Sequence, residues 1–137
     1  MSMYEKYMVD ARNLCDSQYT QKVIETSPII NVCIYGAGRS PGASERLDRL
    51  GYPSVFLDRG LIGLENTSPE FNHVVIKNLK LFPFLFLFAS DLEQDIYSRA
   101  IKNLNVPLKN IFYNEIEFAN LVKKRKVALP SLNEKSR

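Results

Sequence analysis

A cysteine and an arginine separated by five residues are the side chains whose types and spacing point most directly to chemistry. The segment that contains them reads CIYGAGRSP, from Cys33 to Pro41, with Ser40 directly after Arg39. A loop this short between a strand and a helix can direct its backbone N–H groups onto one tetrahedral oxyanion. Arg39 can then bind two oxygens of that anion with its planar guanidinium. The pattern therefore predicts a site for phosphate or a similar anion.

The loop between the two residues is expected to hold this anion mainly through its backbone. Gly36 and Gly38 can adopt positive φ angles and allow a ligand to approach the chain closely. The residues predicted to bind phosphate are Ile34, Tyr35, Gly36, Ala37, Gly38 and Arg39.

The same positive surroundings act on the thiol of Cys33. Inward-facing amides, a helix N-terminus and an arginine all favour a thiolate, so Cys33 is the predicted nucleophile. Ser40 has two roles open to it: capping the following helix, or donating a hydrogen bond to the cysteine thiolate when a phosphoenzyme breaks down. Cys15 has Gln21 rather than arginine six positions later. We interpret Cys15 as a thiol on a helix face, with a redox partnership to Cys33 as the alternative.

The elements that must position this loop alternate between strands and helices. Apolar, β-branched runs predict strands at 29–35, 55–57, 84–88 and 110–113, and amphipathic patterns predict helices at 40–51, 68–80, about 91–104 and 115–126. This alternation indicates right-handed β-α-β units and a parallel sheet covered on both faces. Ligands of such sheets bind beyond the carboxyl ends of the strands. Cys33 lies at this end of the first predicted strand. The predicted fold class is α/β with four strands.

Composition limits the classes of protein that this chain can represent. It has 137 residues, 45% of them hydrophobic and 24% charged, which predicts one folded domain. The net charge of +3 favours anionic ligands but does not indicate a nucleic-acid partner. The longest apolar run, 81–89, is shorter than the about 20 residues of a membrane span. Two cysteines without a secretory signal make the cytoplasm the expected location.

We divide the chain into three parts: a helical extension at 1–28, an α/β domain at 29–126 and a flexible tail at 127–137. In the extension, apolar residues at spacings of three and four predict helices, with Asp16 or Ser17 capping the second one. A single histidine, His73, together with two dispersed cysteines predicts no metal site. We expect no cofactor.

The segment CIYGAGRSPGASERL resembles the signature of the low-molecular-weight protein tyrosine phosphatase superfamily. Its members carry C-x5-R-S, commonly followed by proline, alanine and glutamate, which match Pro41, Ala43 and Glu45 here. The order of elements from residue 29 to about residue 125 is similar as well. The resemblance implies a three-layer sandwich with a four-stranded parallel sheet in the order 2-1-3-4, a cysteinyl-phosphate intermediate and no metal. It also implies a phosphorylated protein or a small phosphomonoester as substrate.

Two positions depart from the family pattern. The family usually has asparagine where this chain has Gly36, and its general acid is an aspartate in an Asp-Pro element that this chain lacks. The corresponding segment reads YNEIEF, so Glu115 or Glu117 is the candidate to protonate the leaving oxygen. Their alternative role is the ordinary negative charge of a first helical turn. Asp58 and Asp91 also follow strands, and we interpret them as a turn residue and a helix cap.

The predicted function is a cysteine-dependent phosphomonoester hydrolase, similar to a protein tyrosine phosphatase. A non-catalytic module that binds phosphate on the same fold is the first alternative, because such a module needs no general acid. A rhodanese-like sulfurtransferase is suggested by RLGYPSVFLDRGLIGLEN, although rhodanese domains place most of their chain before the cysteine. Arsenate reductase shares the loop, and here Cys15 would supply its second thiol. The sequence does not predict an oligomeric state.

Overall fold

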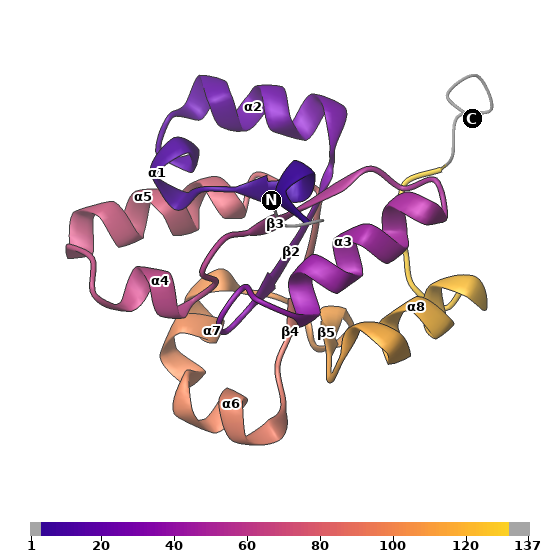
Figure 1. Ribbon diagram of the computed structural model, residues 1–137. Coiled ribbons are helices and arrows are strands. Elements are labelled where there is room, and N and C mark those ends of the chain that lie inside the picture. The colour runs from indigo at the N-terminus through magenta and orange to yellow at the C-terminus, as the bar shows by residue number, and fades with distance from the viewer. Residues whose placement is uncertain (1–3, 132–137) are drawn as a thin grey trace.

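The computed structural model describes residues 4–131, and its centre is a parallel β-sheet of five strands (Figure 1). The strands are β1 (Met8–Val9), β2 (Ile29–Cys33), β3 (Ser54–Leu57), β4 (Phe84–Phe88) and β5 (Ile111–Phe112). They lie in the order β1-β3-β2-β4-β5. The two longest strands, β2 and β4, pair along their whole length, which places Cys33 opposite Phe88 at their carboxyl ends.

This sheet corrects the prediction of four strands in the order 2-1-3-4, because it has a fifth strand at one edge. The four predicted strands, now β2 to β5, keep the predicted relative order as β3-β2-β4-β5. The additional strand, β1, lies in the segment 1–28, for which the sequence predicts only helices. It pairs with β3 at one edge of the sheet, with Met8 opposite Phe56 and Val9 opposite Leu57. Two residues are too few to show an alternating pattern, so β1 depends on tertiary pairing that the local sequence does not reveal.

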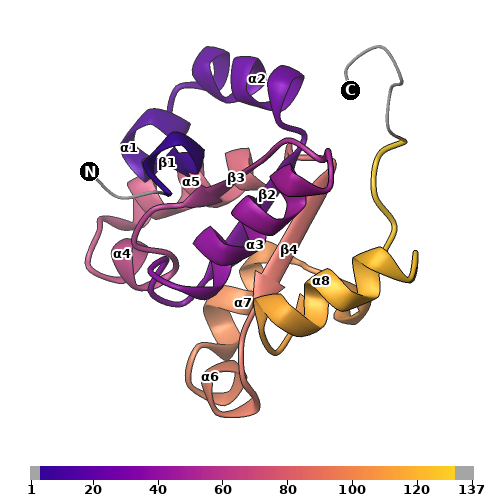
Figure 2. The same ribbon diagram turned by 45° about the vertical axis from the view of Figure 1, so that its right-hand side comes forward.

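Helices cover both faces of the sheet, as Figures 1 and 2 show, and the predicted α/β class is confirmed. One face carries α1 (Ala11–Leu14), α2 (Ser17–Thr26), α5 (Pro69–Leu79) and α7 (Ser98–Leu104), and the other carries α3 (Arg39–Arg49) and α8 (Glu115–Lys123). Four short helices connect these elements: η1 (Glu5–Tyr7), α4 (Ile62–Glu65), α6 (Asp91–Ile96) and η2 (Leu108–Asn110). In both views α6 projects beyond the carboxyl end of β4.

Side chains alternate along the central strands and fill two separate cores. Ile30 and Val32 of β2 pack towards α1 and α5, whereas Ile29 and Cys33 pack towards α3 and α8. The second core contains four phenylalanine rings with centroids 4.8 to 6.0 Å apart, from Phe86, Phe88, Phe112 and Phe118. Burying a side chain of this size stabilises the fold by about 1.5–3 kcal/mol. Cys33 therefore ends a rigid strand on the side of α3.

Several predicted helix ends are confirmed. Asp16 caps α2, Ser68 caps α5, and Gly51 follows α3 with a φ of 92°. The predicted helix at about 91–104 is instead two helices, α6 and α7, with a break at Tyr97 (φ −106°, ψ 23°). The apolar spacing continues across this break, so the pattern alone could not locate it.

The end of the described chain packs against the protein. Val127 and Leu129 contact the core between the sheet and α8, so the first part of the predicted flexible tail contributes to packing. The rest of that prediction, 132–137, lies outside the described residues. Among residues 4–131, no helix has both the length and the apolar character needed to cross a membrane.

Candidate functional site

The sulfur of Cys33 lies inside the loop that follows β2. The residue is buried, with 1% of its surface exposed. The Gly36 N–H donates to this sulfur at 3.1 Å, and the Ser40 hydroxyl is within hydrogen-bond distance of it, also at 3.1 Å.

Ser40 does not cap the helix that follows the loop. α3 begins at Arg39 with Gly38 as its N-cap, and no side chain caps it. Ser40 is therefore the second residue of α3, and its hydroxyl lies within hydrogen-bond distance of the cysteine sulfur. The prediction that Ser40 caps this helix is wrong because the helix begins two residues earlier than the Ser-Pro signal suggests.

The remaining loop residues divide into those that build the loop and those that are free to contact a ligand. Ile34 is buried in the core beside α5, whereas the Tyr35 side chain is 58% exposed. Within residues 4–131, the N–H groups of Tyr35, Ala37 and Gly38 donate to no protein acceptor. Together with the N-terminus of α3, these amides are available to an anion.

A second loop, between β3 and α4, is hydrogen-bonded to the backbone of the cysteine loop and holds it in place. The Leu61 N–H donates to the Cys33 carbonyl at 3.0 Å, and the Ile62 N–H donates to the Ile34 carbonyl at 2.8 Å. The two loops approach so closely that a Cβ on Gly36 would lie 2.6 Å from the Gly60 nitrogen. Gly36 and Gly60 both have positive φ angles, of 65° and 57°. Neither position can accommodate a side chain without moving the backbone.

Arg39 is held by Glu93, which comes from α6. Its Nη1 and Nη2 donate to the two carboxylate oxygens of Glu93 at 2.5 and 2.6 Å. Both side chains are only partly exposed to solvent, with an exposed fraction of 24% for Arg39 and 18% for Glu93. Glu93 uses one edge of the guanidinium, so the edge that contains Nε remains available for two oxygens of an anion.

Glu93 has a strongly lowered pKa. The hydrogen bonds from Arg39 lower the pKa of Glu93 from its usual 4.5 to about 2, burial opposes the shift, and the Ser90 N–H adds to it. In return, the hydrogen bond to Glu93 raises the pKa of Arg39. Glu93 is therefore ionised at neutral pH and positions Arg39 rather than donating a proton.

Sequence reasoning missed Glu93, although a local signal was present. Ser90 and Glu93 form a capping box at the start of α6, in which the serine hydroxyl accepts from the Glu93 N–H and the carboxylate accepts from the Ser90 N–H. The spacing of serine and glutamate predicts this box. It does not predict the second partner of the carboxylate, because Arg39 lies 54 positions away.

Replacing Glu93 by glutamine is expected to change how stability depends on pH. A carboxylate with a lowered pKa stabilises the folded state above about pH 4.5, and this contribution is lost as the pH falls through about 2. Because solvent screens this partly exposed pair, we expect Glu93→Gln to lower the free energy of unfolding by about 1–2 kcal/mol at pH 7. Urea unfolding at pH 7 and pH 3 measures the difference in free energy of unfolding between the wild type and Glu93→Gln. This difference should be smaller at pH 3.

Asp95→Asn is the matched control, because Asp95 is an exposed carboxylate of the same helix with no ion pair within the described chain. A difference of equal size at both pH values for Glu93→Gln would contradict the prediction.

Glu115 lies at the site and Glu117 does not. A Cβ on Gly42 of α3 would lie 3.1 Å from the Glu115 Cγ, and the charge of Glu115 contributes to the raised pKa of Arg39. Glu117 is exposed and lines a separate depression with Asn120. Two positions on a helix differ by about 200°, so only one of these glutamates can face α3. Of these two alternatives, Glu115 is therefore the one that lies against α3, and its role as general acid stays a prediction.

The remaining candidates lie elsewhere. Cys15 is half-buried in the core on the opposite face of the sheet, where burial raises the pKa of its thiol, so it is not a partner for Cys33. Ser90 rather than Asp91 caps α6. The Asp58 N–H donates to the Val9 carbonyl. Among residues 4–131, no three His, Cys, Asp or Glu side chains gather where they could hold a metal ion.

Comparisons with protein-family models, with curated proteins and with solved structures found no match to this chain. Its function therefore has to be inferred from the geometry around Cys33 itself.

Proposed function

We propose that this protein is a cysteine-dependent phosphomonoester hydrolase similar to a protein tyrosine phosphatase, with Cys33 as its nucleophile. The main support for this proposal is the position of the Cys33 sulfur. Sγ has hydrogen-bond partners in Gly36 and Ser40, and the same loop presents amides without protein acceptors and ends at Arg39. The resemblance of CIYGAGRSP to a phosphatase signature supports the same function, and the parallel α/β sheet is compatible with it.

In the first step, the Cys33 thiolate attacks phosphorus in line with the leaving oxygen. A sulfur–phosphorus bond forms as the phosphorus–oxygen bond of the ester breaks. The loop amides and the free edge of Arg39 hold the three equatorial oxygens, where negative charge is spread in the transition state. Glu115, in its protonated form, gives its proton to the leaving oxygen.

In the second step, water attacks the cysteinyl phosphate. The Glu115 carboxylate takes the proton of this water, and the sulfur–phosphorus bond breaks with its electron pair returning to Sγ. The Ser40 hydroxyl, 3.1 Å from the sulfur, stabilises the departing thiolate by a hydrogen bond. The products are inorganic phosphate and the free alcohol or phenol.

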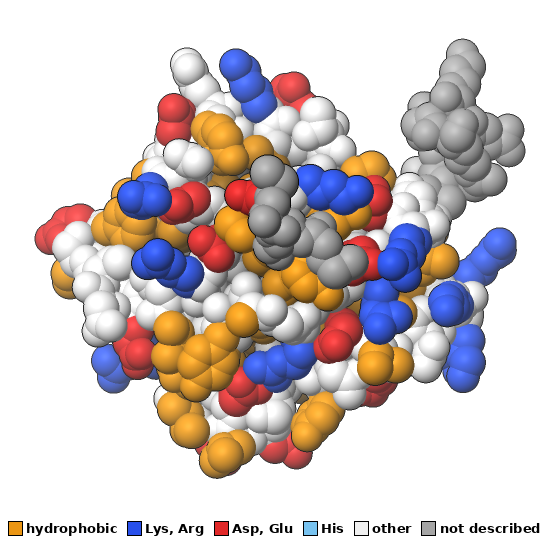
Figure 3. All heavy atoms as spheres, viewed as in Figure 1, with side chains coloured by type: hydrophobic (Ala, Val, Ile, Leu, Met, Phe, Trp, Pro, Cys, Tyr) orange, Lys and Arg blue, Asp and Glu red, His pale blue; other side chains and the backbone are white. Residues whose placement is uncertain are grey.

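Exposed apolar side chains on the elements that form this site favour an aromatic ester. They are Tyr35 (58% exposed) from the cysteine loop, Leu92 (68%) from α6 and Tyr113 (61%) from the loop before α8. Figure 3 shows orange areas over the lower part of this face, where Figure 1 places α6. A phosphorylated tyrosine ring could pack between such side chains, whereas a small polar ester would leave them in water.

Hydrolysis of para-nitrophenyl phosphate between pH 5 and pH 8 tests the proposal. This substrate has a good leaving group and needs little help from an acid. Turnover, together with a phosphate adduct trapped by acid quench on the peptide that contains Cys33, would support the mechanism. A folded protein that binds phosphate but shows no turnover would contradict it and favour the non-catalytic binding module.

Glu115→Gln is expected to slow the hydrolysis of esters with poor leaving groups. The kcat for phenyl phosphate should fall by about 10²-fold, the usual contribution of general acid catalysis, because phenolate leaves poorly without a proton. The kcat for para-nitrophenyl phosphate should fall much less. Steady-state kinetics with both substrates measures the difference.

Glu117→Gln is the control for this experiment, since Glu117 belongs to the same helical turn but faces away from α3. An equal loss on both substrates in Glu115→Gln would mean that Glu115 supports the loop rather than the leaving group.

A further inference from the structure

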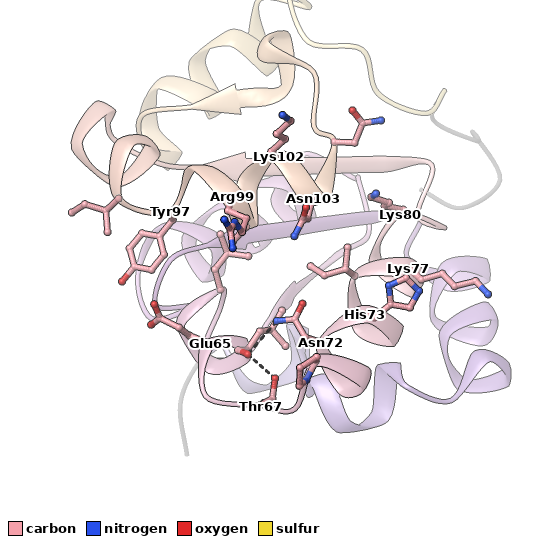
Figure 4. Close-up of a pocket in the computed structure, with 17 residues that line it drawn as sticks. Glu65, Thr67, Asn72, His73, Lys77, Lys80, Tyr97, Arg99, Lys102 and Asn103 are labelled. Atoms are coloured by element: carbon pink, nitrogen blue, oxygen red, sulfur yellow. Dashed lines mark hydrogen bonds between the residues drawn. The ribbon is translucent and has the colours of Figure 1, made fainter.

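A large groove lies between α5 and α7, on the face of the sheet opposite to α3 and α8 (Figure 4). Its volume is about 1250 Å³, larger than the about 300–1,000 Å³ of most small-molecule pockets. Leu61, Leu64 and Ile76 form a buried apolar floor. None of the residues 33–39 lines this α5–α7 groove, so it is distinct from the cysteine loop.

Lysine and arginine supply most of the charged side chains that line the α5–α7 groove. They are Lys77 and Lys80 from the α5 side and Arg99 and Lys102 from α7, and His73 of α5 lies among them. Glu65 is the acidic side chain among the described residues of the lining. Within residues 4–131, none of the four lysines and arginines forms an ion pair with a carboxylate. The groove therefore presents positive charge that the described protein does not neutralise.

Side chains of the two helices line opposite sides of the groove. In Figure 4, Arg99 and Asn103 lie on the α7 side, and His73 lies beside Lys77 on the α5 side. Lys77 and Lys102 point outwards at the rim. An anionic ligand inside the groove would contact Arg99 over an apolar floor, where a charge interaction is less screened than on an open surface.

One end of the groove adjoins the cysteine loop. Leu61 lines the groove, and its N–H donates to the carbonyl of Cys33 at 3.0 Å. Burial and then the charge of Glu65 raise the pKa of Tyr97, which is also in the lining, and Tyr35 and Glu93 add smaller effects. A chain bound at the Cys33 site could therefore continue into the groove.

The shape of the groove fits an extended peptide. Along α5 its lining runs from Pro69 to Lys80, which at about 1.5 Å per residue corresponds to about 16 Å. An extended chain advances about 3.3 Å per residue, so about five residues span this length. A compact anion such as a single phosphate would fill only a small part of it.

We propose that the α5–α7 groove binds an acidic, extended segment of the phosphoprotein substrate, a few residues from the phosphorylated side chain. This inference rests on the proposed function for its link to catalysis. The binding of the acidic segment itself does not require turnover, and so it can be tested separately.

The first test measures binding of a fluorescein-labelled peptide with four consecutive glutamates and no phosphate, by fluorescence anisotropy. In Lys80→Glu/Arg99→Glu the Kd should rise by at least about tenfold. The control Lys123→Glu/Lys126→Glu carries the same change in charge on exposed residues at the end of α8 and should change the Kd by less than about twofold. A wild-type protein that does not bind the peptide, or equal losses in both variants, would overturn the inference.

The second test compares kcat/KM for two phosphotyrosyl peptides, one flanked by four glutamates and one by four glutamines. The wild type should prefer the first by at least about tenfold, and Lys80→Glu/Arg99→Glu should lose this preference. Equal kcat/KM values in the wild type would overturn the role of the groove in substrate choice. Tighter binding of a thymidylate hexamer than of the glutamate peptide would also overturn it, in favour of nucleic acid.

The two proposals can fail independently. Absence of turnover with para-nitrophenyl phosphate, combined with peptide binding that depends on Lys80 and Arg99, would overturn the hydrolase while supporting the acidic-peptide site. Turnover without such binding would support the hydrolase and overturn the acidic-peptide site.

Discussion

Cys33→Ser should lower the kcat for para-nitrophenyl phosphate by at least about 10³-fold while the protein stays folded. A serine hydroxyl at this position can still accept from the Gly36 N–H, so the loop keeps its shape. It is not ionised near neutral pH, so it is a much weaker nucleophile than a thiolate. Removal of a nucleophile of this kind costs more than most other single changes in an active site. Steady-state kinetics measures the loss of kcat, and thermal unfolding shows whether the variant remains folded.

Cys15→Ser provides the control, since this second thiol lies in the core on the other face of the sheet. Its turnover should remain close to that of the wild type. If Cys33→Ser kept its activity, the cysteinyl-phosphate mechanism would have to be abandoned.

Gly60→Ala is expected to destabilise the fold and to disturb the cysteine loop at the same time. The new Cβ would overlap the carbonyl oxygen of Cys33 and lie 2.7 Å from that of Ile34. A left-handed residue other than glycine costs about 1–2 kcal/mol, and the two hydrogen bonds from Leu61 and Ile62 are worth about 1 kcal/mol each. The free energy of unfolding should fall by about 3–4 kcal/mol, as measured by urea titration, with loss of turnover.

Gly38→Ala is a matched change in the same region. A Cβ at Gly38 would meet no atom within 4 Å, and its φ of −135° is accessible to alanine. The free energy of unfolding should change by no more than about 1 kcal/mol, the usual effect of an altered N-cap. Equal losses in the two variants would show that contact between the loops is not what makes Gly60 necessary.

The sequence predicted local structure well where the residues that determine it lie in one short segment. The run from Cys33 to Ser40 predicted an anion loop because strand, glycines, arginine and helix start follow one another directly. The helix at 68–80 was equally clear, since its serine cap, proline and apolar spacing agree. In both cases local propensity and tertiary structure favour the same conformation.

Features that depend on distant contacts could not be predicted in this way. The pairing of Arg39 with Glu93 joins the first turns of α3 and α6, which follow different strands. The close approach of Gly60 to Gly36 joins the β3–α4 loop to the cysteine loop, and nothing in the sequence around Gly60 distinguishes it from an ordinary turn. The choice of Glu115 over Glu117 required the rotation of α8 about its axis, which a boundary uncertain by one residue leaves open.

The short strand β1 also affects how molecules of this protein meet one another. β1 and β5 are the two edge strands, and each has only two residues, so little unpaired backbone is offered to another chain. Without β1, the outer side of β3 would become the edge, and all four residues of β3 are buried. An apolar edge of this kind is a template for intermolecular β-pairing and aggregation. The N-terminal segment thus protects the sheet that carries Cys33 from self-association.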